Sequence, residues 1–400
     1  MSKAESDRQA LRSVAMSSPD LSEAERTAVA EVLQTRWLAT GPRARAFEAA
    51  VAATVGVRHA VAVNSGTAAL HLSLLAAGVK DGDLGLTTPF SFVASSNVYL
   101  YERAVPVFVD VDPLTGNLDP ALAAAAAADL KEGGSAGERW LPPHGARQGS
   151  PLTSMLAVDV FGQPADYDRL RPLAAEHDLV LIEDSCEALG AGYNGRAAGT
   201  LADVGAFAFF PNKQVTTGEG GMIVTDNDEW AAALRALRNQ GRSPEDAWLE
   251  YSYIGYNYRM DEMSAALGEV QVGRLDELLT HRHQVAGWYG ERLARLEGVE
   301  PLEIVPSTTS MSWFVYVVRL DPAIDSSALL HTLKERGIPT RPYFTPIHLQ
   351  PPYIERFGYR EGMFPVAEDL GRRSLALPFS GVMTQDEVHT VCDVLAEVIA

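Results

Sequence analysis

A single lysine has an unusual setting in the stretch FFPNKQVTTGEGG, residues 209–221. Lys213 follows the apolar run VGAFAFF and precedes threonines, glycines and the apolar run MIV. A lysine in a loop is usually a solvated surface charge, but this position predicts a side chain that projects from the end of a buried strand into a pocket. Burial favours the neutral amine, which can attack a carbonyl carbon and form a Schiff base. The glycines would let the backbone pass close to a bulky ring.

Asp184 ends the apolar run LVLIE, at the end of a second expected strand. A carboxylate there can hold the proton of a pyridine nitrogen through a charge-assisted hydrogen bond, as proteins do when they tune pyridoxal phosphate. A capped turn and a metal ligand are the alternatives. No metal is expected, because Glu183 and Asp184 point to opposite sides of a strand and no histidine pair lies nearby at ligand spacing.

The segment Asn64 to Thr67 follows the run HAVAV and opens the helical pattern AALHLSLLAAG. Free N–H groups at a helix start, a glycine and two hydroxyls form a phosphate cradle. An ordinary Ser/Thr helix cap is the alternative interpretation. In open α/β sheets, ligands bind at the carboxyl ends of strands, and all three segments stand directly after an expected strand.

Residues 190–195 formally satisfy the dinucleotide pattern G-x-G-x-x-G. That fingerprint requires glycines that join a strand directly to a helix. Here SCEAL intervenes, and the following RAAGTLADVG is not an amphipathic helix. We therefore reject a nicotinamide-cofactor site in this segment.

The elements that must position these residues alternate along the chain. Between residues 57 and 225, helical patterns separate seven short β-rich runs: HAVAV, GLTT, VPVFVDV, MLAVDVF, LVLIEDS, VGAFAFF and GMIVTD. This alternation predicts a three-layer α/β domain with a mostly parallel seven-stranded sheet. The order of the strands cannot be read from the sequence.

The pattern changes near Met260, where a long helical stretch leads to the strand SWFVYVVRL and two further helices. We interpret this part as a smaller α+β domain, with residues 20–265 as the large domain and 266–400 as the small one. The N-terminal helix SEAERTAVAEVLQT is counted with the large domain and is expected to pack beside the small one.

Composition excludes several classes of function. The chain has 400 residues and a net charge of −19, which would repel nucleic acid and anionic membranes from most of the surface. No apolar run reaches the length of a membrane span, and the first residues have no secretory apolar core. Two cysteines, Cys186 and Cys392, fit a reducing environment, so we expect a cytoplasmic protein.

Nine blocks, in the same order and over nearly the whole chain, resemble the nucleotide-sugar aminotransferases. This family is a fold-type-I branch of the pyridoxal-phosphate enzymes, in the aspartate-aminotransferase superfamily. The blocks are WLATGPRARAFE, VNSGTAALHLSL, PFSFVAS, VFGQPADYDRL, IEDSCEALGA, FFPNKQVTTGEGGMIVTD, LRNQGR, GYNYRMDEMSAALG and RPYFTPIHLQPPY. The resemblance implies pyridoxal 5′-phosphate as the cofactor.

The resemblance also implies roles for single residues. Lys213 matches the lysine that binds the cofactor and, once released by substrate, moves the proton between substrate Cα and cofactor C4′. Asp184 matches the carboxylate paired with the pyridinium nitrogen. Ser65, Gly66 and Thr67 match the phosphate loop.

Further matches concern the ring, the second subunit and the substrate. Phe92 matches the aromatic residue that stacks on the cofactor ring, with a plain core phenylalanine as the alternative. Asn257 matches an asparagine that reaches the cofactor phosphate of the neighbouring subunit, which implies a homodimer with shared active sites; Arg259 is expected to pair nearby. Four residues match a region near the substrate entrance: Trp37, Thr40, Tyr343 and His348.

Two positions depart from the family pattern. Ala208 stands where many members carry a serine that bonds the phosphate, so one donor is missing or replaced. Glu187 stands where glutamine or histidine is common, and is expected near the 3′-oxygen of the cofactor. Neither change affects Lys213 or Asp184.

The expected reaction moves an amino group from L-glutamate, or glutamine, to a keto-sugar nucleotide. A GDP- or dTDP-linked 4-keto-6-deoxyhexose is the favoured acceptor, from the overall resemblance of FFPNKQ and IHLQPPY to 4-amino-sugar enzymes. The alternatives are an aminotransferase for a cyclitol or another free keto compound, a sugar dehydratase of the same fold, and a non-catalytic regulator. The dehydratase carries histidine in place of Lys213, and a regulator would be expected to lose Lys213 or Asp184.

Overall fold

A seven-stranded sheet forms the centre of the computed structural model, which describes residues 14–147, 149–243, 246–247 and 249–399. Its strands, in spatial order, are β1 (His59–Val63), β9 (Gly221–Thr225), β8 (Val204–Ala208), β5 (Val180–Asp184), β4 (Leu152–Val158), β2 (Leu84–Thr87) and β3 (Val105–Phe108). Only β9 runs against its neighbours in this sheet, since it pairs antiparallel with both β1 and β8. The predicted seven-stranded, mostly parallel sheet is confirmed.

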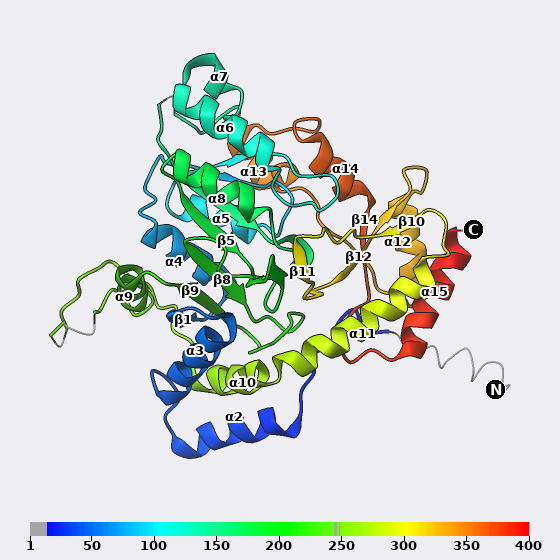
Figure 1. The fold of residues 1–400 in the computed structure, drawn as a ribbon, viewed down its shortest axis with the longest axis horizontal. Coiled ribbons are helices and arrows are strands. Elements are labelled where there is room, and N and C mark those ends of the chain that lie inside the picture. Colours follow the sequence, from blue (N-terminus) through cyan, green and yellow to red (C-terminus); the bar gives the residue numbers. More distant parts are fainter. Residues whose placement is uncertain (1–13, 148, 244–245, 248, 400) are drawn as a thin grey trace.

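The strands are apolar on both faces because helices cover both sides of the sheet. Along β4, for example, Leu156 and Val158 face one core while Met155 and Ala157 face the other. One helical layer consists of α4 (Gly66–Ala76), α5 (Ala94–Tyr101) and α9 (Asp228–Leu237). The other consists of α3 (Pro42–Val55), α6 (Pro120–Glu132), α8 (Tyr167–Glu176) and α10 (Glu262–Gly273). Figure 1 shows this arrangement as the three-layer body expected from the sequence.

A second body lies beside the central sheet, on the right in Figure 1. Its four-stranded sheet has the order β10 (Val299–Pro301), β12 (Tyr316–Leu320), β14 (Ser374–Leu377) and β13 (Arg341–Pro342). The long helix α11 (Leu275–Leu293) packs on α15 (Gln385–Ile399), and α12 (Ser326–Glu335) also contacts α15. Residues of α11, α12 and α15 share one apolar core with β12 and β14.

The remaining elements are shorter. They are α7 (Gly134–Glu138), α13 (Pro351–Phe357), α14 (Pro365–Arg373), the 3₁₀ turns η1 (Val160–Gly162) and η2 (Ile347–Leu349), and a small sheet of β11 (Thr308–Ser310), β6 (Gly192–Tyr193) and β7 (Arg196–Ala197). The G-x-G-x-x-G segment forms the antiparallel pair β6–β7, with no helix after it, so the rejection of a dinucleotide site agrees with the fold. Among the helices of the described residues, none combines the length and apolar composition that spanning a membrane requires.

The N-terminal helix α2 (Glu23–Thr35) packs on α10 through Ala28, Val32 and Ala266. The division predicted at residue 265 therefore falls inside α10, a helix whose main contacts are with α3 and α2. Before α2, residues 14–20 run along the second body, where Val14 joins its core and Met16 O accepts a hydrogen bond from Phe379 N at 2.9 Å. The chain thus links both bodies before its first described helix begins.

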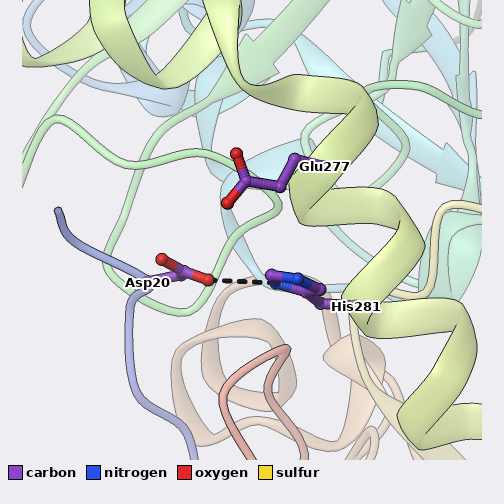
Figure 2. Close-up of side chains that lie close together, drawn as sticks. All are labelled: Asp20, Glu277 and His281. Atoms are coloured by element: carbon purple, nitrogen blue, oxygen red, sulfur yellow. Dashed lines mark hydrogen bonds and ion pairs between the residues drawn. The ribbon is translucent and has the colours of Figure 1, made fainter.

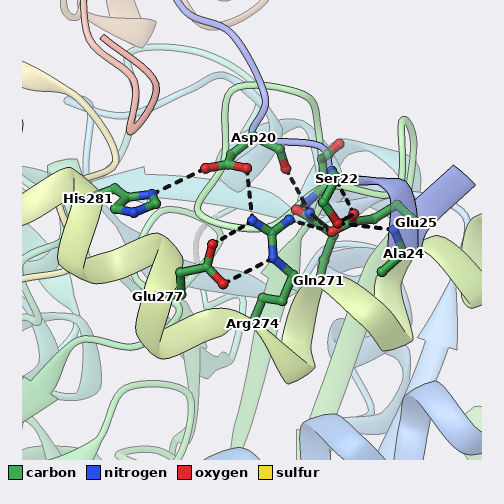
Figure 3. A network of polar contacts seen from close by, with 9 residues as sticks. Asp20, Ser22, Ala24, Glu25, Gln271, Arg274, Glu277 and His281 are labelled. Carbon is green, nitrogen blue, oxygen red and sulfur yellow. Dashed lines mark hydrogen bonds and ion pairs between the residues drawn. The ribbon is translucent and has the colours of Figure 1, made fainter. Parts of the chain in front are cut away.

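Arg274, at the junction of α10 and α11, holds this N-terminal segment in place (Figure 3). Its guanidinium binds Asp20 at 2.9 Å, Glu25 at 2.7 Å and Glu277 at 2.8 Å. Burial would raise the pKa of Glu25, but hydrogen bonds from Ser22, Arg274 and Gln271 lower it to about 2. Ser22 and Glu25 also form the capping box that starts α2, so the Arg274 network fixes the beginning of that helix.

Candidate active site

A cavity of ≈ 470 Å³ lies at the carboxyl ends of the central strands, where a parallel sheet is expected to bind its ligand. Four of its lining residues end or follow β1, β4, β5 and β8: Ser65, Val158, Asp184 and Ala208. Phe314 and Tyr343, from the second body, close the other side. The site is therefore formed between the two bodies, and α4, which begins at Gly66, points its first turn at it.

Lys213 lies in the loop between β8 and β9, and its side chain lines this cavity. Both ends of the loop are fixed, because Phe209 N donates to Gly220 O at 2.9 Å and Thr217 N donates to Phe209 O at 3.0 Å. The Lys213 side chain is only 12% exposed. Its Nζ lies 3.7 Å from Glu187 Oε1 and 3.7 Å from the centre of the Phe314 ring.

A buried arginine binds the backbone of the loop that carries Lys213. Arg282, on α11, donates to Lys213 O at 2.6 Å and to Trp313 O at 2.9 Å. Burial lowers the pKa of its guanidinium to about 10. Arg282 therefore connects the backbone of the lysine loop to the strand region that carries Phe314.

Asp184 ends β5 and directs its carboxylate into the same cavity. Oδ2 accepts a hydrogen bond from Ser95 Oγ at 2.7 Å, and Oδ1 accepts one from Cys186 N at 3.2 Å. Sequence reasoning missed Ser95, although it belongs to the block SFVAS, three residues after Phe92. The donated hydrogen bond orients the carboxylate and leaves it room for another partner in the cavity.

Glu183 points to the opposite face of β5, as strand alternation predicts. Its carboxylate is fully buried, accepts from Leu201 N at 2.7 Å and from Ser185 Oγ at 2.8 Å, and shares Ser185 with Asp159. Burial raises the pKa of both Glu183 and Asp159. Asp159 N donates to Asp184 O at 3.1 Å, so this pair holds the strand end behind the Asp184 side chain.

Glu187 lies on the cavity wall beside Lys213. Its Oε2 accepts from Phe161 N at 2.9 Å. Burial raises the pKa of this carboxyl, while the nearby Lys213 charge opposes that shift. The side chain thus gives the lysine amine an acidic neighbour inside a largely closed space.

The first turn of α4 forms the floor of the cavity through Ser65, Gly66 and Thr67. Ser65 is the N-cap, and its Oγ accepts from Ala68 N at 3.1 Å. A side chain at position 66 would not fit, since a Cβ there would lie 2.6 Å from Ala208 Cβ and 3.0 Å from Cys186 Sγ. The segment is both a helix cap and part of the cavity surface, so the two interpretations of its sequence are compatible.

These groups fit pyridoxal 5′-phosphate. The cavity offers an amine for its aldehyde, a buried carboxylate for its ring nitrogen and a helix N-terminus for its phosphate. Phe92 lines the cavity and is 62% exposed, so it is not the core phenylalanine that was the alternative. Ala208 lies against Gly66 and brings no hydroxyl to the phosphate end.

The predicted substrate residues lie in different places. Tyr343 lines the cavity, and burial followed by the Glu187 charge raises the pKa of its hydroxyl. His348 is fully buried away from the cavity lining, with Nε2 3.0 Å from Glu368 Oε1, which gives it a structural position instead. Trp37 and Thr40 are exposed in the turn between α2 and α3 and do not line the cavity of their own chain.

Asn257 is also exposed and does not reach this cavity in its own chain. Its backbone pairs with Asn239, whose side chain Oδ1 accepts from Arg259 Nη1 at 3.1 Å. Exposed apolar side chains precede it, including Ile254, which is 94% exposed. The single chain therefore presents Asn257 on an apolar part of its surface.

Two other places bring charged side chains together. A hollow of ≈ 970 Å³ at the opposite ends of β5 and β8 contains Arg58 and Arg171, but Arg58 pairs with Asp228 and Arg171 binds Leu201 O. Figure 2 shows Asp20, Glu277 and His281, which are spaced as metal ligands could be. The Arg274 guanidinium already binds both carboxylates, so the protein supplies its own cation there.

The chain matches known proteins in sequence and in fold. The model of the DegT/DnrJ/EryC1/StrS aminotransferase family matches residues 19–396. A GDP-perosamine synthase of Caulobacter vibrioides is 36% identical over 389 residues, 96% of this chain and 98% of the relative. The Helicobacter pylori aminotransferase PseC, involved in pseudoaminic acid biosynthesis, matches with a TM-score of 0.85 at 27% identity over 96% of this chain and 99% of its own. The 3-amino-5-hydroxybenzoic acid synthase structure matches with a TM-score of 0.84 at 26% identity, over 96% and 97%.

Proposed function

The chain belongs to the DegT/DnrJ/EryC1/StrS aminotransferase family and depends on pyridoxal 5′-phosphate, and from this premise we propose that it aminates a keto sugar linked to a nucleoside diphosphate. L-glutamate, or glutamine, is the amino donor. The acceptor is a 4-keto-6-deoxyhexose carried by GDP or dTDP, and the product is an amino sugar. We place the reaction in the cytoplasm.

One observation carries the proposal. Lys213, Asp184 and the first turn of α4 come from distant parts of the chain and line one cavity. A dehydratase of this fold would carry histidine at position 213, and a non-catalytic regulator would have no need to keep both charged groups at the cavity. Similarity to a GDP-perosamine synthase supports a sugar nucleotide as acceptor.

Lys213, Asp184 and Ser95 each have a separate role in the proposed reaction. Bound pyridoxal phosphate supplies an electron sink that weakens the C–H bond beside the transferred nitrogen. Lys213 would hold the cofactor covalently, and its Nζ, once released, moves the proton at the substrate Cα. Ser95 orients the Asp184 carboxylate, which would hold a proton on the ring nitrogen of the cofactor through a charge-assisted hydrogen bond.

The cavity walls contribute orientation and exclusion of water. The free N–H groups of α4 and the hydroxyls of Ser65 and Thr67 would bind the phosphate. Phe92 offers an apolar face to the ring, and Phe314 covers the Lys213 amine. Glu187, which lines the cavity, would face the 3′-oxygen of the ring, as the resemblance implies.

We also propose a homodimer with shared sites. Asn257, Trp37 and Thr40 are exposed in one chain, and each would complete the site of a second copy. The apolar residues beside Asn257 favour this arrangement, since exposed apolar clusters commonly mark protein contacts. Cross-linking and mixed dimers of Lys213→Ala and Asn257→Ala chains would test it, because one intact site per mixed dimer should restore part of the activity.

A panel of acceptors tests the function. The purified protein is incubated with L-glutamate and either GDP- and dTDP-linked 4-keto sugars or keto-cyclitols, and 2-oxoglutarate formation is followed. We expect turnover only with a nucleotide-linked sugar. Turnover with keto-cyclitols alone would favour the alternative of a free keto acceptor.

A further inference from the structure

A second chamber of ≈ 250 Å³ adjoins the active-site cavity. Asn212, Phe314 and Tyr343 line both spaces, so they form the boundary between them. The remaining walls come from the N-terminal segment and from the strands of the four-stranded sheet or the residues next to them: Met16, Ser17, Val315, Arg341, Leu377 and Phe379. We call this space the Arg341 chamber.

Arg341 is the cationic residue of this chamber. Among the residues that line the two spaces, the only cationic side chains are Lys213 and Arg341. Arg341 is an exposed residue of β13. Its Nη1 makes a long hydrogen bond to Thr340 O at 3.3 Å, and no carboxylate of the described residues lies within ion-pair distance of its guanidinium. By contrast, Arg274 binds three carboxylates. The guanidinium of Arg341 therefore has donors available for an anion that enters the chamber.

Two residues that line the chamber also hold buried polar atoms without partners. Ser17 Oγ and Asn212 Oδ1 are both shielded from solvent, and neither has a hydrogen-bond partner within the described ranges. Because amide oxygen and nitrogen exchange places when the Asn212 side chain turns over, this residue can present N–H donors instead. Buried polar groups without partners are rare, because each costs folding free energy. A ligand that forms hydrogen bonds with them would remove that cost.

The chemistry of the amino donor fits this arrangement. Glutamate must place its amino group beside Lys213 while its carboxylates find cationic partners in a protein of net charge −19. A guanidinium binds a carboxylate or a phosphate through two parallel hydrogen bonds. The chamber is about half the volume of the main cavity, which suits a carboxylate arm better than a diphosphate with its nucleoside.

We propose that the Arg341 chamber is the subsite that binds a carboxylate of the amino donor, through Arg341 with help from Ser17 and Asn212. The inference rests on the proposed function, which supplies glutamate as donor. Arg341 acts as a specificity residue for the first half-reaction, and the keto-sugar half-reaction does not depend on it.

The first test measures binding without turnover. Glutarate and its neutral diamide are titrated into the holoenzyme by calorimetry. Wild-type protein should bind glutarate and not the diamide, and Arg341→Gln should weaken glutarate binding about 10- to 100-fold, the range for a lost charge-assisted contact. Arg295→Gln is the matched control, since this exposed arginine lines neither space.

The second test separates the half-reactions by stopped-flow absorbance. Arg341→Gln should lower kcat/KM for glutamate about 10- to 100-fold, as it lowers glutarate binding, and should leave the rate with a saturating keto-sugar nucleotide unchanged. Arg341→Lys should recover part of the loss. If only the sugar half-reaction slows, the chamber binds the acceptor's phosphate and the inference is overturned. Unchanged glutarate binding overturns it as well.

Ser17→Ala gives an independent check should Arg341→Gln fold poorly. It should weaken glutarate binding about 3- to 10-fold, since a neutral hydrogen bond contributes less than a charged one. An unchanged affinity would count against the chamber. Failure of the proposed function would look different, because wild-type protein would then form no 2-oxoglutarate from glutamate with any acceptor.

Discussion

The Lys213 cavity and the Arg274 network are two places where buried charges from distant segments meet, and their bonding differs. Arg274 binds Asp20, Glu25 and Glu277 at 2.7 to 2.9 Å. Among the residues that the structure describes, Glu187 is the one ionic neighbour of Lys213 Nζ, at 3.7 Å, and the amine covers the Phe314 ring. In the first region each charge is neutralised by close partners, whereas in the second the amine keeps its bonding capacity.

The difference separates a structural role from a catalytic one. A buried ion network with complete hydrogen bonding is costly to break, because removing one member leaves the others buried without partners. An amine that must change its bonding partner during a reaction cannot be held so tightly. Damage to the network should therefore appear as lost stability, and damage to the cavity as lost activity.

Lys213→Ala should have the largest effect. The variant loses both the covalent attachment and the proton carrier, so activity should fall by at least about 10³-fold, within the range expected for acid–base catalysis combined with covalent catalysis. The visible absorption of the lysine-bound cofactor should disappear, while the melting temperature stays close to that of the wild type. Activity assays, spectra and thermal unfolding check this.

The exposed Lys80 supplies the control for that substitution. Lys80→Ala removes the same charge from the chain and should keep wild-type activity and colour. Full activity in Lys213→Ala would remove the basis of the active-site assignment.

Arg274→Met should affect stability more than activity. The substitution keeps much of the side-chain volume but leaves Glu25, which is 2% exposed, without its guanidinium partner. The free energy of unfolding should fall by about 3–5 kcal/mol. Urea denaturation measures the loss, and the folded fraction should retain its turnover number.

Arg26→Met tests whether burial is the cause. Arg26 also pairs with a glutamate, Glu23, at 3.0 Å, but both side chains are exposed. Its loss should cost no more than about 1 kcal/mol. Equal effects of the two substitutions would contradict the distinction drawn between the two regions.

Acid should weaken the network in a defined range. The pKa of Glu25 is lowered from 4.5 to about 2 in the folded protein, so its contribution is complete above pH 4.5 and is lost as the pH falls from 4.5 toward 2. A shift of this size corresponds to roughly 3 kcal/mol. Urea midpoints at a series of pH values should therefore fall more steeply for the wild type than for Glu25→Gln. Parallel curves would show that Glu25 does not carry this dependence.

Much of the fold was predictable because local patterns determine it. Alternating apolar runs and helical segments indicated the seven strands, and three residues at or beyond the ends of strands, Ser65, Asp184 and Lys213, were found as candidates for the site. Strand order was not predictable, since it depends on which apolar faces pack together across the whole chain. The division predicted at residue 265 falls inside α10, because the helical pattern of this stretch shows no break there.

The rest of the site depends on contacts between distant segments. Ser95 reaches Asp184 across 89 positions, and Arg282 reaches the lysine loop across 69. His348 was placed near the substrate by its block, but its side chain turns inward to Glu368, 20 positions later. Arg341 and Ser17 lie at opposite ends of the sequence, and no local pattern connects them. Only the folded chain shows which of these side chains still have free donors.

The loop that carries Lys213 is anchored at both ends by the β8–β9 pairing, so the sheet determines where the side chain at position 213 begins, whatever that side chain is. The side chain at position 213 can therefore be exchanged while the backbone that carries it stays in place. A single substitution at position 213 would change the reactive group of the cavity and leave the residues around it unchanged, which is a short evolutionary route to a different reaction. In directed evolution, the residues that anchor the loop should therefore be kept, while position 213 and the residues that line the active-site cavity are varied.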